Sequence, residues 1–225
     1  METSQPVTDT TQFDLAKSLL ALENQLKGGI GWFYWIAGLS LINTAIFLTG
    51  GSLTFVAGLG LTQIVDYFAY GFSLELSGTL AVIIRGMGAA VSVFFALLFI
   101  LCGYFGRKRI RWVVIAGFIV YALDAVIVVA FGEWYSFLFH LLALFGLFRG
   151  FKAIKALNEL EKAHAAGDIS VIRTHLEQSA KIYGQVNPSI DPAKRKARML
   201  RFTLFIVGLF SIPVIYLVIM ILVNK

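Results

Sequence analysis

Long, almost uncharged apolar stretches constrain the fold of this chain more than any other feature. A helix needs about 20 mostly apolar residues to cross the hydrocarbon core of a bilayer. The sequence contains six such stretches, at residues 30–49, 53–71, 79–105, 112–131, 135–151 and 201–223. They predict an all-α fold, a polytopic membrane bundle of about six transmembrane helices. The stretches 53–71 and 135–151 are short enough to be re-entrant, which leaves five or four crossings as alternatives.

The composition agrees with a membrane protein and argues against a soluble one. Hydrophobic residues make up 58% of the chain and charged residues 14%, whereas soluble domains average about half apolar and about a quarter charged residues. With 225 residues, the chain has room for several spans in one bundle but not for several large domains.

Basic residues gather on one side of the predicted spans. The 106–111 loop contains four of them and residues 149–201 contain eleven more, together fifteen of the nineteen lysines and arginines. Because cytoplasmic loops accumulate Lys and Arg, 106–111 and 151–200 are predicted to be cytoplasmic. Six crossings then place both termini outside. These residues flank spans and form no recognisable binding module, so the sequence indicates no nucleic-acid partner.

Changes in composition divide the chain into four parts. They are an amphipathic N-terminal tail (1–29), a five-span membrane block (30–151), a cytoplasmic helical hairpin with a basic linker (152–200) and a final transmembrane helix (201–223). In the tail, FDLAKSLLALENQLKGG is typical of an amphipathic helix that ends at Gly28 and Gly29, and no cleavable signal peptide is expected. In the hairpin, Gly167 should end the first helix and Asp168 should cap the second. This hairpin could lie on the membrane surface or dock a cytoplasmic partner.

A basic cluster directly precedes the last predicted span. Such clusters attract anionic lipid headgroups by about 1 kcal/mol per basic residue near the surface. The predicted contacts to anionic lipid are Lys194, Arg195, Lys196, Arg198 and Arg201.

Four ionisable residues interrupt the apolar spans at a common depth, namely Asp66, Arg85, Asp124 and His140. Each lies five to seven residues from the predicted outer end of its span, about 8–10 Å below the boundary at a rise of 1.5 Å per residue. Ionisable residues at such depth pair, face the bundle or line a wet cavity. We expect either two structural pairs, Asp66 with Arg85 and Asp124 with His140, or a polar cavity open to the outer side. Asn43 and Thr44 fall nearer the inner side if the first span runs inward, where they could extend a polar path or bond to backbone carbonyls.

Signatures of catalysis and metal binding are scarce in the sequence. It has no GxSxG nucleophile elbow and no HExxH pair, and Cys102 is the only cysteine. A mononuclear metal site formed by Asp66, Asp124 and His140 is a weaker alternative than the two structural pairs. We therefore expect no catalytic residue, no cofactor and no metal.

Three classes of function remain after these exclusions. The first is a non-enzymatic accessory or interaction subunit of a membrane complex, whose partners are the lipid bilayer and a membrane protein or a second copy of the chain. The alternatives are a small transporter or channel-like protein that uses the polar cluster, and a membrane enzyme that acts on a lipid-like substrate. Over the fourth and fifth spans the pattern YALD…GEW…FH…RG resembles segments of small bacterial membrane proteins, which implies the bacterial cytoplasmic (inner) membrane.

Overall fold

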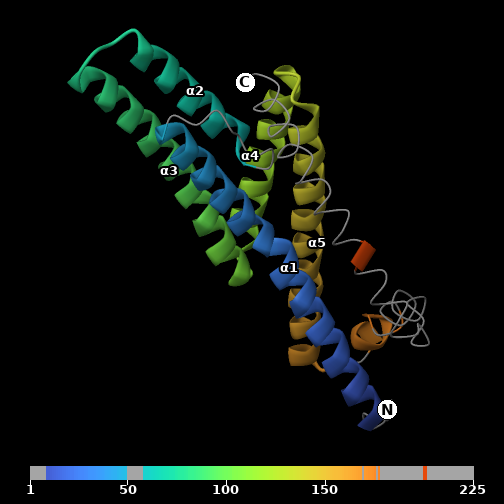
Figure 1. Ribbon diagram of the computed structural model, residues 1–225. Coiled ribbons are helices and arrows are strands. Elements are labelled where there is room, and N and C mark those ends of the chain that lie inside the picture. The colour runs from blue at the N-terminus through green and yellow to red at the C-terminus, as the bar shows by residue number, and fades with distance from the viewer. Residues whose placement is uncertain (1–8, 50–57, 169, 176, 178–199, 202–225) are drawn as a thin grey trace. The chain divides into compact units, whose positions relative to one another are not determined.

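The computed structural model of the protein describes residues 9–49, 58–168, 170–175, 177 and 200–201. Residues up to Ile172 form one compact unit, and the fold below is that of this unit. Its helices are α1 (Asp9–Leu48), α2 (Gly60–Leu74), α3 (Thr79–Arg107), α4 (Arg111–Ala130) and α5 (Trp134–Ala166) (Figure 1). The described part of the chain contains no strand.

Four of these helices are long and apolar enough to cross a membrane. They comprise Leu15–Leu48, Thr79–Arg107, Arg111–Ala130 and Trp134–Ala166. The prediction of an all-helical integral membrane protein is therefore confirmed. The stretch 53–71 contributes α2, whose 15 residues measure about 22 Å, less than the roughly 30 Å of hydrocarbon, so α2 fits the re-entrant alternative. The last predicted span, 201–223, lies almost wholly outside the described residues, and the count of six stays a prediction.

The helix predicted to end at Gly28 and Gly29 continues through both, because α1 runs unbroken to Leu48. Gly29 instead marks the point where α1 crosses α5. A Cβ added to Gly150 of α5 would lie 3.0 Å from the Gly29 backbone, so the absence of side chains lets the two backbones approach closely. Likewise α5 does not end near residue 151 but continues to Ala166 as one helix.

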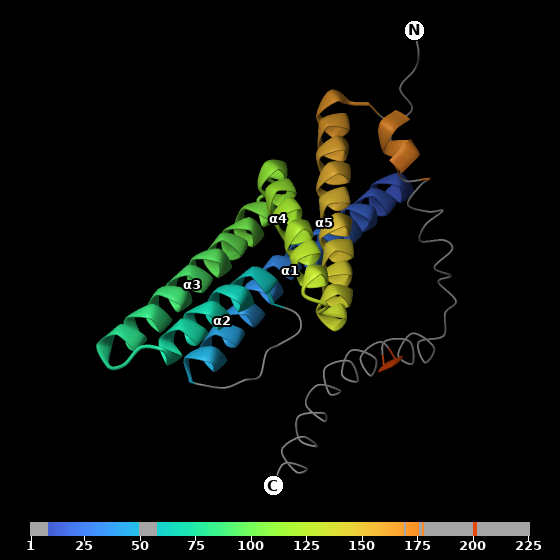
Figure 2. The ribbon, with the colours of Figure 1, turned by 90° about the horizontal axis from the view of Figure 1, so that it is seen from above.

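The core of the bundle forms where α1 crosses between two hairpins. Figure 2 shows α2 and α3 as one hairpin and α4 and α5 as the other, with α1 packed against both. Phe33 of α1 contacts Phe99 of α3 edge-on at 5.8 Å between ring centroids, and Phe99 contacts Tyr121 of α4 at 6.0 Å. All three rings are buried. This chain of rings connects three helices at the centre of the molecule.

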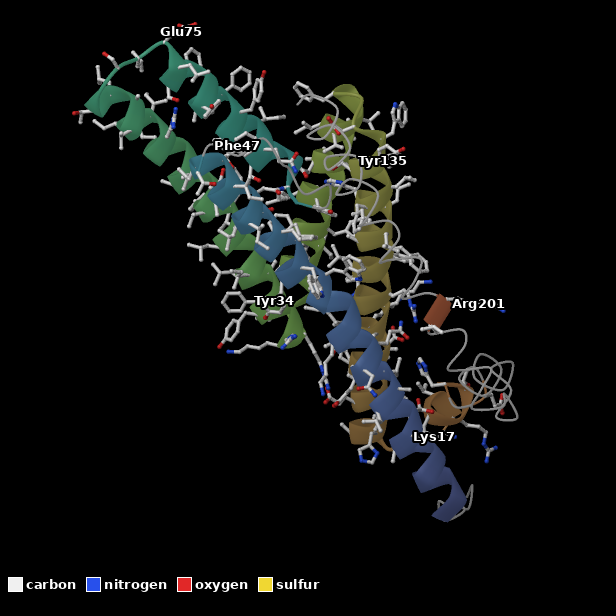
Figure 3. The ribbon with its side chains drawn as sticks, in the orientation of Figure 1. Lys17, Tyr34, Phe47, Glu75, Tyr135 and Arg201 are labelled. Carbon is white, nitrogen blue, oxygen red and sulfur yellow. The ribbon has the colours of Figure 1, made fainter. Side chains whose placement is uncertain are left out.

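The start of α1 lies at the same end of the bundle as the basic loop. Arg109 in that loop lies 3.8 Å from Glu23 of α1 and 2.9 Å from Glu161 of α5. In Figure 3, Lys17 lies toward this end, and Glu75 lies toward the opposite one. This differs from the predicted placement, in which the N-terminus faced away from the 106–111 loop. The short α2 agrees with the re-entrant alternative for 53–71, under which the N-terminus and the 106–111 loop would lie on one side.

The end of α5 agrees with the local sequence signals. Gly167 adopts a left-handed conformation (φ 68°) at the C-cap of α5. The carboxylate of Asp168 then accepts hydrogen bonds from the backbone N–H of Ser170 (3.1 Å) and of Val171 (3.3 Å). Both expectations for Gly167 and Asp168 are therefore confirmed, and the remainder of the predicted hairpin lies mostly outside the described residues.

Candidate functional site

A buried carboxylate on α4 caps the N-terminus of α2. Asp124 is 3% exposed; its Oδ2 accepts a hydrogen bond from Gly60 N and its Oδ1 one from Leu61 N, both at 2.8 Å. The N-cap residue of α2, Leu59, provides no side-chain cap of its own. Free backbone N–H groups and the helix dipole both favour an anion at this position. Asp124 thus fixes where α2 begins inside the bundle.

His140 of α5 also contacts Asp124, and the partners of its two ring nitrogens indicate how many protons the pair holds. The Nε2 atom of His140 lies 2.8 Å from Asp124 Oδ2, and its Nδ1 lies 2.7 Å from the carbonyl oxygen of Ser136. A carbonyl oxygen can only accept, so Nδ1 carries a hydrogen. If Asp124 is ionised, Nε2 must also be protonated and His140 is an imidazolium; otherwise the proton resides on the carboxyl group. The pair shares one proton and is neutral overall in either case.

Tyr121 of α4 forms the floor under His140. Its ring stacks on the imidazole with 4.5 Å between centroids and 13° between planes. Both side chains are fully buried. The hydroxyl of Tyr121 is buried without a hydrogen-bond partner, alone in this among the side chains of the described residues. The stacking therefore holds the imidazole in place through its face, and the hydroxyl takes no part in the Asp124 network.

Hydroxyl groups surround the second buried carboxylate. Asp66 of α2 accepts hydrogen bonds from Thr44 Oγ1 of α1 (2.7 Å) and from Ser92 Oγ of α3 (2.9 Å). One helical turn before Thr44 on α1, Ser40 Oγ accepts a hydrogen bond from Leu59 N at 2.8 Å. α2 is therefore bonded to α1, α3 and α4 through polar side chains. Thr44 reaches Asp66 because the last part of α1 packs against α2.

Arg85 does not form the predicted pair with Asp66. Its Nε donates to Ser73 Oγ at 2.7 Å, and its guanidinium lies 4.9 Å from the centroid of the Tyr70 ring. In the part of the chain that the structure describes, Arg85 makes no ion pair with a carboxylate. Arg85 precedes Ser92, the α3 partner of Asp66, by seven residues, about 10 Å of helix. The sequence placed Asp66 and Arg85 at one depth because it treated α2 as a full span.

A small pocket separates Asp66 from Arg85. Both residues line it together with Thr44, Phe47 and Tyr70, and its volume is about 10 Å³. That is about the room that one water molecule needs. Of the four predicted cluster residues, the structure thus joins Asp124 directly to His140, and it leaves Asp66 and Arg85 on either side of a pocket this small.

Sequence reasoning missed two residues that complete the polar layer, Ser40 and Ser92. We use this name for the polar side chains that connect the first part of α2 to its neighbours, namely Ser40, Thr44, Asp66, Ser92, Asp124 and His140. The signal for Ser40 and Ser92 was present, since both interrupt apolar helices, but a lone serine in a membrane helix often bonds to its own backbone. Among the described residues, no group of three or more His, Cys, Asp or Glu side chains could hold a metal ion.

The predicted lipid contacts before the last span can be located only in part. Lys194, Arg195, Lys196 and Arg198 lie outside the described residues. Arg201 is described as helical and exposed (Figure 3). No protein-family model, curated protein or solved structure matches this chain.

Proposed function

We propose that this protein is a non-enzymatic integral membrane subunit that joins a membrane complex by packing α1 against a helix of a partner protein. The observation that carries the proposal is a second glycine face on α1. Space is open around Gly31 and Gly38, where an added Cβ would meet nothing within 4 Å. Trp35 and Ile42 lie on the same face and are 68% and 46% exposed. These positions alternate spacings of four and three residues, as a helix–helix contact requires.

Open glycines on a membrane helix favour a protein partner over lipid. Lipid tails are as apolar as leucine, so helices associate in a bilayer through close packing, and small residues permit that approach. A glycine in a helix interior costs about 1 kcal/mol relative to alanine. Gly29 offsets this cost by its contact with Gly150 inside the bundle. Gly31 and Gly38 have no such contact within the described residues, and a partner helix would supply it.

The polar layer supports the same function over transport. The carboxylates of Asp66 and Asp124 and both nitrogens of His140 bond to groups of the chain itself. A transporter needs a wet route to its buried charges, whereas the pocket beside Asp66 has a volume of about 10 Å³. The polar contacts thus support a structural role, in which they hold α2 in place.

The proposal includes an orientation in the bacterial cytoplasmic membrane. Lys and Arg next to spans are retained on the cytoplasmic side. The 106–111 loop would therefore face the cytoplasm, and with it the start of α1 and the last turns of α5, which Arg109 contacts.

Affinity purification of the full chain in mild detergent tests the proposal. We expect a membrane protein to be recovered in stoichiometric amount, and the double variant Gly31→Leu/Gly38→Leu to lose it while keeping the thermal stability of the purified chain. Gly86→Leu is the matched control, because Gly86 of α3 is also exposed with open space around it, and this variant should retain the partner.

Two results would contradict the proposal. One is recovery of the chain without a partner. The other is a cross-link between a cysteine at Gly38 and one within 201–223 of the same chain, in a Cys102→Ser background. That cross-link would assign the glycine face to the chain's own last predicted span.

A further inference from the structure

The last part of α5 projects beyond the membrane end of α4. α4 has 20 residues, about 30 Å, which is close to the thickness of the hydrocarbon core. The Arg111 guanidinium at the start of α4 lies 5.7 Å from the centroid of the Phe151 ring, which fixes the level at which α5 passes this boundary. From Phe151, α5 continues to Ala166, about 22 Å further. Figure 1 shows α5 extending past α4 at this end.

A charged pocket lies in the angle between the start of α4 and this projection. Its volume is about 390 Å³, and it is lined by Arg111, Lys155, Asn158, Glu159, Glu161 and Lys162. Pockets for small ligands have volumes of about 300–1,000 Å³. The pocket is therefore large enough for a headgroup, unlike the one beside Asp66.

The lining of this pocket carries three cations and two carboxylates, a net charge of +1. Glu159 lies 3.8 Å from Lys155, and Glu161 lies 2.9 Å from Arg109. The Arg111 guanidinium lies over the Phe151 ring, and neither Arg111 nor Lys162 forms an ion pair within the residues that the structure describes. Two cations without an ion-pair partner among the described residues and the Asn158 amide are suited to a phosphate, whose oxygens accept charge-assisted hydrogen bonds.

The position of the pocket indicates where that phosphate comes from. Trp112, next to Arg111, is 81% exposed, and Ile110 is 40% exposed. An exposed tryptophan at the end of a span lies at the level of the lipid headgroups. We propose that this pocket binds the phosphate of a glycerophospholipid from the adjacent leaflet through Arg111 and Lys162. The site is separate from the basic cluster before 201 and independent of the glycine face of α1.

Native mass spectrometry of the full chain, titrated with phosphatidylglycerol in detergent, tests the site. We expect one lipid to bind more tightly than the rest. The double variant Arg111→Gln/Lys162→Gln should weaken its binding about tenfold or more, since a basic residue near headgroups contributes about 1 kcal/mol. Both side chains are exposed, so unfolding temperature should not change.

The control removes the same charge from the same membrane surface. Lys108→Gln/Lys152→Gln takes two exposed cations from outside the pocket, and it should leave the tight lipid in place. Equal loss of lipid in both double variants would overturn the proposal, because the binding would then be general surface attraction.

A second arm separates the lipid from a soluble phosphate. Inorganic phosphate and glycerol 3-phosphate are added in excess to the lipid-bound chain. Retention of the lipid supports a headgroup site. Displacement of the lipid by either compound would show that the pocket binds soluble phosphate instead, and would overturn the assignment to lipid.

Discussion

Asp124 and Asp66 both hold α2 in the bundle, but the partners of Asp124 are fixed and those of Asp66 can adapt. Two backbone N–H groups at the start of α2 point at Asp124, and a backbone N–H cannot turn to become an acceptor. Asp66 is bound by the hydroxyls of Thr44 and Ser92, and a hydroxyl can rotate to donate or accept. The difference indicates that the cap by Asp124 determines where the short helix α2 begins, whereas the hydrogen bonds of Asp66 further along stabilise it in that position.

The largest effect should come from an isosteric change at Asp124. Asp124→Asn keeps the shape but turns one oxygen into an NH₂ group, which would face the backbone N–H of Gly60 or of Leu61. Breaking a buried pair of this kind costs about 3–5 kcal/mol. We expect most of the folded protein to be lost, measured as the monodisperse fraction in size-exclusion chromatography. A stable, fully folded Asp124→Asn protein would remove the distinction between the two carboxylates.

The same change at Asp66 should be tolerated. In Asp66→Asn the new NH₂ group can donate to Thr44 or Ser92 after the hydroxyl rotates, so the variant loses only part of one hydrogen bond, about 1 kcal/mol. Thermal unfolding in detergent measures this against wild type. A loss of stability as large as that of Asp124→Asn would mean that the hydroxyls of Thr44 and Ser92 are held as rigidly as the backbone.

The smallest effect is expected at Asp168. Its carboxylate accepts hydrogen bonds from backbone N–H groups, as that of Asp124 does, but it is exposed to water. Hydrogen bonds from the Ser170 hydroxyl and from the backbone N–H of Val171 hold the pKa of Asp168 below its ordinary value. The cap therefore contributes fully above the ordinary pKa of an aspartate and is lost as pH falls through the lowered value. Amide exchange at Val171, corrected for intrinsic rates, should accelerate on acidification. In Asp168→Asn this acceleration of exchange at low pH should be absent. An unchanged acceleration would assign it to another titrating group.

Sequence patterns predicted the class of the fold better than its topology. Apolar length identified the four helices that are long and apolar enough to cross a membrane, and Gly167 with Asp168 predicted the end of α5. Gly28 and Gly29 were misread as a helix end, because a glycine that permits a helix crossing has the same sequence signal as a C-cap.

The candidate site was predictable residue by residue but not in its pairing. Burial cost alone identified Asp66 and Asp124 as residues that need partners. Their actual partners depend on where α2 begins, and Asp124, distant in sequence, determines that position. Arg85 was misassigned for the same reason, since a shift of α2 along α3 exchanges Asp66 for Ser73 as its neighbour.

Cysteine labelling tests most directly whether α2 stays within the membrane without crossing it. In a Cys102→Ser background, single cysteines replace Lys17, Glu75 and Lys162, and a membrane-impermeant maleimide is applied to intact cells and to permeabilised ones. We predict that Glu75→Cys reacts in intact cells and that Lys17→Cys and Lys162→Cys react only after permeabilisation. Six crossings would instead put residues 17 and 75 on one side. Reaction of both Lys17→Cys and Glu75→Cys in intact cells would therefore contradict a re-entrant α2.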